Sequence, residues 1–466
     1  MKKIIHLAVY ITAIYTALFC GFSLNCTDYA ALLFLPVTYL FTYILLTYFY
    51  QKTSKYKITI ILVLILLWMR MVYIPYYGTI SGNYNISLSY FSNVIQTAIS
   101  LSIYECFVIC ITLAAICHKN TLKITYSYQP KLYGSRFLYL IFIIIACCVF
   151  LFIGRHLNLL EFGVKAVGTD LGREGDIVDT RLIIIRQIIS SGYLFLFFYL
   201  IERFRQKHSL LSDKKYVNYA IVLAALMTCI IVGERRTAQI YIAFASCWTL
   251  IRTFPENRKQ IVSIIGSTAL GVLMLMTIYK HFNAFLYDSY ISAIQNASID
   301  QGFSAGIIDA YFYGINTIVK NISYGQIANL NLNNMLYDIF RSIFGLNFVL
   351  KGGMLTTSEA YNSYLYSGTQ LTGLLLSSVG YGYIYFGFIL APIFTCLNIC
   401  IMTFLEIKMR VCRSIEMSYI LAYIYMRIAF GLLGSIPPLI NVCTQFLFIN
   451  GAIFLGARVS FKKYLK

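Results

Sequence analysis

Residues 137–154 read FLYLIFIIIACCVFLFIG, a run without a single charged side chain. A helix needs about 20 predominantly apolar residues to cross the hydrocarbon core of a bilayer, so this stretch is a candidate span. Inside a bilayer only helices and closed β-barrels satisfy their backbone hydrogen bonds, and barrel strands are short and alternate in polarity. The long unbroken run therefore predicts a transmembrane helix.

Similar apolar runs recur along the whole chain, and we count twelve. We therefore predict an all-α polytopic membrane protein, with residues 1–466 forming a single integral membrane domain. The predicted spans are 5–24, 30–49, 58–76, 95–117, 137–154, 181–201, 216–233, 238–253, 261–280, 378–405, 415–434 and 438–457.

The overall composition agrees with a membrane location. The chain is 59% hydrophobic and 12% charged, whereas a typical soluble domain is about 25% charged. The net charge of +19 would suggest nucleic-acid binding in a soluble protein. Here most Lys and Arg lie in short loops between apolar runs, which is the pattern that orients membrane proteins. We therefore exclude nucleic acid as a partner.

Positive charge alternates from loop to loop. The loops 25–29, 77–94 and 435–437 contain no Lys or Arg, whereas the intervening loops and both termini are basic. By the positive-inside rule, this alternation places the N and C termini in the cytoplasm. The residues that define the cytoplasmic side are Lys2, Lys3, Lys52, Lys55, Lys57, Lys119, Lys123, Lys131, Arg136, Arg203, Arg205, Lys207, Lys214, Lys215, Arg252, Arg258, Lys259, Lys408, Arg410, Arg413, Arg458, Lys462, Lys463 and Lys466.

Two predicted outer segments are larger than the others, 155–180 and 281–377. The second is an extracytoplasmic loop within the single membrane domain, rich in Gly, Asn, Ser and Tyr and interrupted by apolar patches. Loops of this length are usually functional. We expect residues 281–377 to contain short interfacial helices.

The stretch VGERRTAQIYI, residues 232–242, places Arg235 and Arg236 at the outer end of a span. A charge at the bilayer centre costs about 2.5–3.5 kcal/mol on insertion scales. Arginine never loses its charge and presents a fork of donors that fits phosphate. Snorkelling to the headgroups, or pairing with nearby acids, is the alternative for each arginine. We interpret the outward cations as a site for a lipid-linked phosphate or pyrophosphate. The other predicted ligands of this group are Arg173, Arg181, Lys280, Arg341 and Arg427.

Enzymes that transfer sugars from polyprenyl pyrophosphate carriers are one class of protein that would use such a ligand, and flippases that move those carriers are another. In such an enzyme, transfer to a sugar hydroxyl would need a general base. His281 and Glu359, both in the long loop, are the candidates, although a solvated side chain is the alternative for each. Tyr361 and Tyr364 are candidate sugar-stacking residues, with interfacial anchoring as the alternative. The chain contains no Asp-x-Asp sequence. We therefore predict transfer that needs neither a metal ion nor a cofactor.

Glu105 lies in the middle of a predicted span. An ionisable residue at this depth is a functional candidate by default. It could pair with Arg70 or Arg427 as part of the structure, or belong to a proton pathway, which would favour a transporter.

Two local stretches carry a resemblance to a known family. Gly233-Glu234-Arg235-Arg236-Thr237 resembles the Gly-x-Arg segment at the outer end of a span in the bacterial O-antigen and capsule repeat-unit polymerases, the Wzy family. GLLLSSVGYGYIYFG, residues 373–387, resembles the Gly/Ser-rich run before a late span of that family. Family members often carry Glu after the Gly of this run, where this chain has Tyr381. The predicted spans, large outer loops, abundant aromatic residues and outward arginines extend the resemblance to nearly the whole chain.

The resemblance implies a glycosyltransferase of GT-C-like architecture in the bacterial cytoplasmic membrane. Such an enzyme polymerises undecaprenyl-pyrophosphate-linked repeat units at the outer face by inverting transfer to a sugar hydroxyl. Arg235 and Arg236 would stabilise the charge that develops on the pyrophosphate leaving group. The implied partners are lipid-linked glycans, the bilayer and a chain-length regulator protein.

Three other functions stay open. An O-antigen ligase shares the architecture and donor but transfers to the lipid A core. A lipid-linked oligosaccharide flippase handles the same lipid but needs no long outer loop. A secondary transporter would often show a repeat of its two halves, and no such repeat is visible.

Overall fold

The computed structural model describes eleven stretches of the chain, and statements about structure below refer to these residues. The described residues are 2–53, 56–84, 92–119, 129–154, 161–162, 180–231, 236–281, 287–296, 304–350, 354–365 and 375–463.

The chain divides into two compact units, and each is assembled from separate stretches of sequence. Unit 1 comprises Met1–Thr125, Phe303–Ile407 and Arg427–Thr444, and unit 2 comprises Tyr126–Gly302, Lys408–Met426 and Gln445–Lys466. Each unit thus combines stretches that are distant in the sequence, and the single membrane domain stays a prediction.

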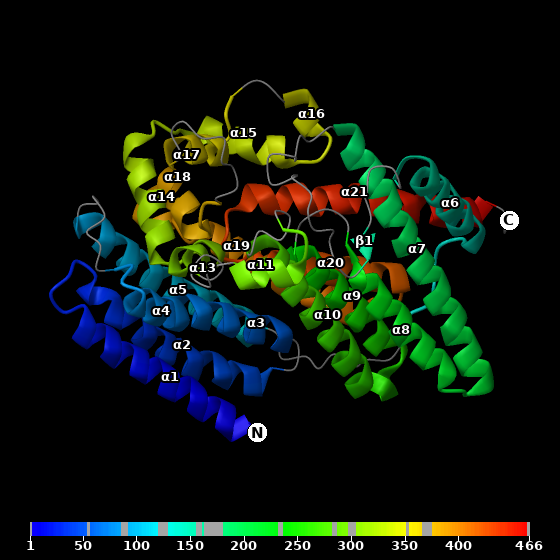
Figure 1. Cartoon of the computed structure of the whole chain (residues 1–466), viewed down its shortest axis with the longest axis horizontal. Coiled ribbons are helices and arrows are strands. Elements are labelled where there is room, and N and C mark those ends of the chain that lie inside the picture. Colours follow the sequence, from blue (N-terminus) through cyan, green and yellow to red (C-terminus); the bar gives the residue numbers. More distant parts are fainter. Residues whose placement is uncertain are drawn as a thin grey trace. The chain divides into compact units, whose positions relative to one another are not determined.

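Unit 1 begins with a layer of neighbouring helices in which α2 packs against α1, α3 and α5, and α14 packs against α5 and α18 (Figure 1). Its elements are α1 (Lys2–Ser23), η1 (Ala30–Leu33), α2 (Phe34–Lys52), α3 (Lys57–Trp68), η2 (Met69–Tyr73), α4 (Ile74–Ile80), α5 (Ser92–Lys119), α13 (Ala305–Phe312), α14 (Ile315–Ile327), α15 (Leu332–Ser342), α16 (Leu346–Leu350), α17 (Thr357–Leu365) and α18 (Ser378–Leu390).

In unit 2, α7 packs against α6 and α8, and α8, α9 and α10 pack pairwise (Figure 1). Three late helices, α19 (Ile393–Val411), α20 (Ile415–Phe430) and α21 (Ile436–Lys463), contribute residues to both units. The remaining elements are α6 (Arg136–Val149), η3 (Phe150–Gly154), β1 (Glu161–Phe162), α7 (Thr180–Leu211), α8 (Lys215–Cys229), β2 (Ile230–Ile231), α9 (Arg236–Thr253), η5 (Pro255–Asn257), α10 (Arg258–His281) and α11 (Tyr290–Asn296).

Among the described residues, eight helical stretches are long and apolar enough to cross a membrane, or nine if one bent pair counts as a span. The helical membrane class is therefore confirmed. Each of the twelve predicted spans contains a helix among its described residues, but α8, α9 and α20 do not combine the length and hydropathy of the eight. The eight stretches are Ile4–Ser23, Ala30–Lys52, Lys57–Ile80, Asn93–His118, Arg136–Ile153, Ile184–Leu211, Pro255–Tyr279 and Ile436–Arg458.

The predicted span 378–405 is not one continuous helix, because α18 and α19 meet at an angle of 106°. Gly387 adopts φ +71° and ψ −172° before the bend, a conformation that glycine adopts without strain. Pro392 follows in the connection and lacks the N–H that a continuous helix would use. A Cβ on Gly382 would lie 2.0 Å from the carbonyl oxygen of Ala391. Glycine at position 382 therefore permits the close approach of the two arms.

Buried carboxylates fix several helix starts. Glu406 of α19 accepts hydrogen bonds from the backbone N–H groups of Ile58 and Thr59, at 3.1 and 2.9 Å, where α3 begins. Asp309 of α13 accepts from the N–H group of Thr317, at 2.8 Å, in the first turn of α14. The first N–H groups of a helix have no partner within the helix and carry partial positive charge. These acids therefore stabilise the helix ends that they contact.

The expectation of short helices within residues 281–377 is confirmed. Helices α11, α13, α14, α15, α16 and α17 lie in this segment, and none exceeds the 13 residues of α14. Tyr324 and Tyr361 from this segment pack with Leu376 and Tyr381 into an aromatic-rich core. The part of the segment from α13 onward is therefore folded into unit 1 through this core, whereas α11 belongs to unit 2.

Candidate functional site

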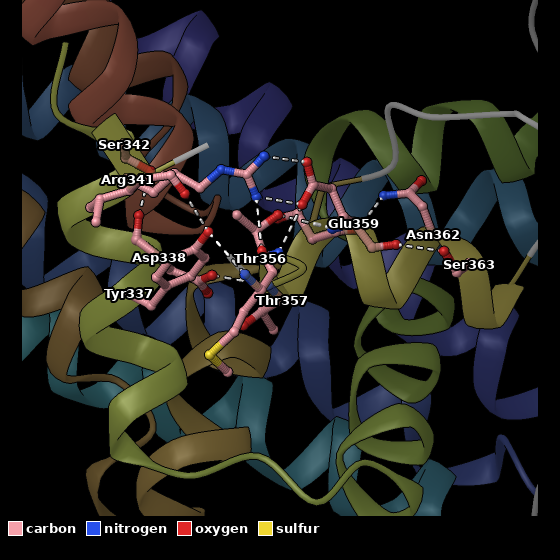
Figure 2. A network of polar contacts seen from close by, with 12 residues as sticks. Tyr337, Asp338, Arg341, Ser342, Thr356, Thr357, Glu359, Asn362 and Ser363 are labelled. Atoms are coloured by element: carbon pink, nitrogen blue, oxygen red, sulfur yellow. Dashed lines mark hydrogen bonds and ion pairs between the residues drawn. The ribbon is translucent and has the colours of Figure 1, made fainter. Parts of the chain in front are cut away.

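The two predicted site residues Arg341 and Glu359 face one another across two short helices (Figure 2). Arg341 lies in the last turn of α15, and Glu359 lies in the first turn of α17. The guanidinium donates from Nη1 to Oε2 at 2.6 Å and from Nη2 to Oε1 at 3.0 Å. This paired geometry is the strong, directional form of the arginine–carboxylate contact.

Glu359 also belongs to a capping box at the start of α17. The Thr356 N–H group donates to Glu359 Oε2 at 2.8 Å, and the Glu359 N–H group donates to Thr356 Oγ1 at 3.2 Å. The sequence Thr356-Thr357-Ser358-Glu359 carries the Ser/Thr-x-x-Glu signature of this motif. Sequence reasoning missed this signal, which assigns Glu359 a role in starting a helix.

The contacts of Glu359 change its acidity. Burial favours a raised pKa for its carboxyl, but the hydrogen bonds from Arg341 and Thr356 outweigh burial, and the pKa falls below its ordinary value. The same ion pair raises the pKa of Arg341. A carboxylate with a lowered pKa is a weaker proton acceptor. The role of Glu359 as a general base stays a prediction, and this geometry lowers its basicity.

A third ionisable residue of the network, Asp338, was not found from the sequence. It lies on α15 and is 2% exposed. Its Oδ1 accepts from the Thr357 N–H group and its Oδ2 accepts from the Tyr381 hydroxyl, both at 3.0 Å. Burial raises the pKa of Asp338 above its ordinary value. Asp338 thus brings a carboxyl to Tyr381, at the position where the resembled family often carries Glu.

The two tyrosines predicted to stack on sugars have different surroundings. Tyr361 is 1% exposed, and its ring packs edge-on against Tyr324 with centroids 5.4 Å apart. Tyr364 also contacts Tyr324, with centroids 5.5 Å apart, and exposes 38% of its surface. A sugar ring can stack only on an exposed aromatic side chain. Tyr364 has exposed surface for such a contact, whereas Tyr361 lies in the core.

A second polar cluster lies where the bent pair α18–α19 meets α5. Glu105 is 1% exposed and pairs with Arg70 at 2.6 Å, which confirms one of its two predicted partners. The Thr395 hydroxyl donates to Glu105 Oε1 and lies 2.9 Å from Ser378 Oγ. Arg70 belongs to η2, a π-helical turn, and such turns frequently occur at functional sites. The cluster therefore connects a buried charge pair to the starts of both α18 and α19.

Two residues of the predicted outer segment 155–180 pair with the strand that follows α8 in a short antiparallel ladder. Glu161 lies opposite Ile231 and Phe162 lies opposite Ile230. Ile231 precedes Arg235 by four residues in the sequence. The pairing therefore joins the predicted segment that carries Arg173 to the backbone that precedes Arg235 in the sequence.

The side chains of most predicted phosphate ligands are not among those that the structure describes. Arg173 and Arg235 lie outside the described residues, whereas Arg427 lies in the last turn of α20 with a partly exposed side chain. Three more lie in helices at positions whose side chains are not described: Arg181 in α7, Arg236 at the start of α9 and Lys280 at the end of α10. The same holds for the predicted base His281, the last residue of α10.

No group of three or more His, Cys, Asp or Glu that could hold a metal ion occurs in the part of the chain that the structure describes. The prediction of metal-independent chemistry stays a prediction. No protein-family model matches the chain, and no curated protein or solved structure matches it either.

Proposed function

We propose that the protein polymerises oligosaccharide repeat units carried on undecaprenyl pyrophosphate at the outer face of the bacterial cytoplasmic membrane. The proposal unites the helical membrane class, the long folded outer segment and the arginines at the predicted outer ends of spans. The observation that carries it is the β1–β2 pairing, because it joins the backbone of segment 155–180 to the stretch that leads into Arg235. Arginines contributed by two such segments suit a pyrophosphate, which offers several oxygen acceptors.

In the proposed reaction, a hydroxyl of the acceptor sugar attacks the anomeric carbon of the donor glycan. The new glycosidic bond forms as the bond to the pyrophosphate breaks, with inversion at the anomeric carbon. Negative charge builds on the departing undecaprenyl pyrophosphate, and preorganised cations stabilise the transition state where that charge develops. We assign this role to Arg235 and Arg236, with Arg173 and Arg181 as supporting ligands.

The acceptor hydroxyl must also lose its proton. His281 and Glu359 are the proposed bases, and the lowered pKa of Glu359 makes His281 the stronger candidate of the two. The pKa of Asp338 is raised, but its carboxyl is buried and accepts hydrogen bonds from Thr357 and Tyr381. It would need a rearrangement of α17 to reach a substrate.

The experiment that tests the proposal is substitution of Arg235 and Arg236 with Ala, separately and together, followed by display of the cellular glycan ladder at matched protein abundance. Loss of the ladder, with single repeat units still transferred to their acceptor, supports a polymerase. Arg203→Ala is the matched control, because Arg203 is exposed and lies in a predicted cytoplasmic loop. A normal ladder in the double variant would remove the pyrophosphate assignment. Complete absence of transferred glycan would favour a ligase or a flippase.

A flippase is the second candidate, and the bent pair α18–α19 favours it. Broken helices beside buried charges line the substrate sites of many transporters. Purified protein in liposomes separates the two functions. Polymer formed from lipid-linked units presented on the outside supports the polymerase, whereas movement of these units between leaflets without bond formation supports the flippase.

A further inference from the structure

Helix α15 presents its apolar side outward and its polar side inward. Leu332, Leu336 and Phe340, spaced four residues apart on one side, are 52%, 46% and 49% exposed. On the opposite side Asp338 is 2% exposed and Arg341 is 20% exposed. A helix on the surface of a protein in water shows the reverse arrangement, with its apolar stripe facing the core.

The polar side of α15 is fully engaged within unit 1. Asp338 accepts from Thr357 at the start of α17, and Arg341 holds Glu359 (Figure 2). The Tyr337 hydroxyl donates to the carbonyl group of Leu350, which ties α15 to α16. These contacts fix the rotation of α15 about its axis, so the apolar side cannot turn inward without breaking them.

Helix α16, Met354 and Leu355 also expose apolar side chains. Leu346, Phe348 and Val349 are 42%, 49% and 79% exposed, and Met354 and Leu355 are 50% and 64% exposed. Contiguous apolar patches of this kind on soluble proteins mark interaction sites. The surface therefore requires an apolar environment.

The structure also shows where this surface lies along a membrane helix. The Phe344 N–H group, between α15 and α16, donates to Thr444 Oγ1 of α21 at 3.0 Å. Thr444 is eight residues beyond Ile436, where both α21 and its apolar span begin. At about 1.5 Å per residue this is roughly 12 Å along the span. The turn between α15 and α16 thus contacts the flank of a span rather than its end.

We propose that the apolar side of α15 and α16 is embedded among the acyl chains of the bilayer, in the outer leaflet by the predicted topology. Amphipathic helices of this kind bury their apolar face about 5–10 Å into the boundary between headgroups and acyl chains. The helix pair then anchors the Asp338–Arg341–Glu359 network beside the membrane. This inference does not depend on the proposed catalytic function.

The native chain in vesicles tests the inference directly. The protein is reconstituted with a phosphatidylcholine that carries a diazirine in its acyl chain, irradiated, and digested, and labelled residues are assigned by fragmentation mass spectrometry. We expect label on α15 and α16, including Leu336 and Phe340. Helix α17 is the internal control, because its exposed residue Ser363 is polar and should stay unlabelled.

A second measurement gives an independent readout. Val349→Trp changes a side chain that is 79% exposed, so the substitution should not disturb packing. Compared with the parent protein, the added emission should be quenched by brominated acyl chains and protected from aqueous iodide, whereas that of Ser363→Trp should show the opposite pattern. Label confined to the long spans, together with iodide quenching at position 349, would overturn the inference. Crosslinks between copies at α15 in place of lipid label would overturn it as well, since they would identify a protein partner.

Discussion

Removing one member of the buried pair Arg70–Glu105 should strongly destabilise unit 1. The two side chains are 3% and 1% exposed, and their closest atoms are 2.6 Å apart. The Nε and Nη2 atoms of Arg70 have no hydrogen-bond partner among the described residues. In Glu105→Gln, the guanidinium therefore loses the carboxylate that compensates its charge. We expect the free energy of unfolding to fall by about 3–5 kcal/mol, the usual cost of leaving one buried charge unpaired.

Replacing both members separates the cost of an unpaired charge from the worth of the pair. Arg70→Met with Glu105→Leu removes both charges and keeps similar volume. Apolar replacements of whole buried ion pairs are often neutral or stabilising by about 1–4 kcal/mol. The double variant should therefore be markedly more stable than Glu105→Gln. The loss of the hydrogen bond from Thr395 to Glu105 lowers the gain in the double variant.

An exposed ion pair in the same chain provides the matched control. Lys215 and Asp213 lie 3.6 Å apart, and their side chains are 75% and 38% exposed. Such pairs contribute about 0.2–1 kcal/mol, so Asp213→Asn should have little effect on stability.

The assay is thermal unfolding of the purified protein in detergent, and the readout is the fraction of protein that stays monodisperse. With roughly 2–4 °C per kcal/mol for domains of 150–250 residues, Glu105→Gln should lower the midpoint by about 6–20 °C. The reasoning fails if Glu105→Gln and Asp213→Asn shift the midpoint equally. It also fails if the double variant is as unstable as Glu105→Gln, because the loss would then come from packing.

Two further predictions concern unit 1 and its helix ends. Gly382→Ala should lower the free energy of unfolding by at least about 1–3 kcal/mol through overpacking, because the new Cβ would lie 2.0 Å from the Ala391 carbonyl oxygen. The control Gly451→Ala, with no atom within 4 Å of the new Cβ, should be neutral or stabilising in the same thermal assay. Because the Arg341–Glu359 pair lowers the pKa of the carboxyl, its contribution is present above the ordinary pKa of about 4.3 and is lost as the pH falls through the lower folded value. The protection factors of the α17 amides, which correct for the slower intrinsic exchange in acid, should therefore fall by less than the equivalent of about 1 kcal/mol for this partly exposed pair, and Glu359→Gln should reduce this fall.

Much of the helical class follows from hydropathy alone. An apolar run such as residues 137–154 indicates a membrane-spanning helix by itself. The short helices expected within 281–377 are also present. The pairing of Glu105 with a basic residue was also expected, since a charge within a span needs a partner. The capping box at Thr356 and Glu359 was readable as well, because it depends on a local spacing of residues.

Other features depend on contacts between residues that are distant in sequence. Hydropathy does not distinguish a continuous span from the 106° bend of α18–α19, where close approach of the two arms makes Gly382 necessary. Asp338 is unremarkable in the sequence and becomes a buried carboxyl only when Tyr381 and α17 pack on α15. The sequence determined which stretches avoid water, since that property belongs to each stretch by itself. Only the tertiary structure decided which side of each helix meets protein and which is left for lipid, because that depends on what packs beside it.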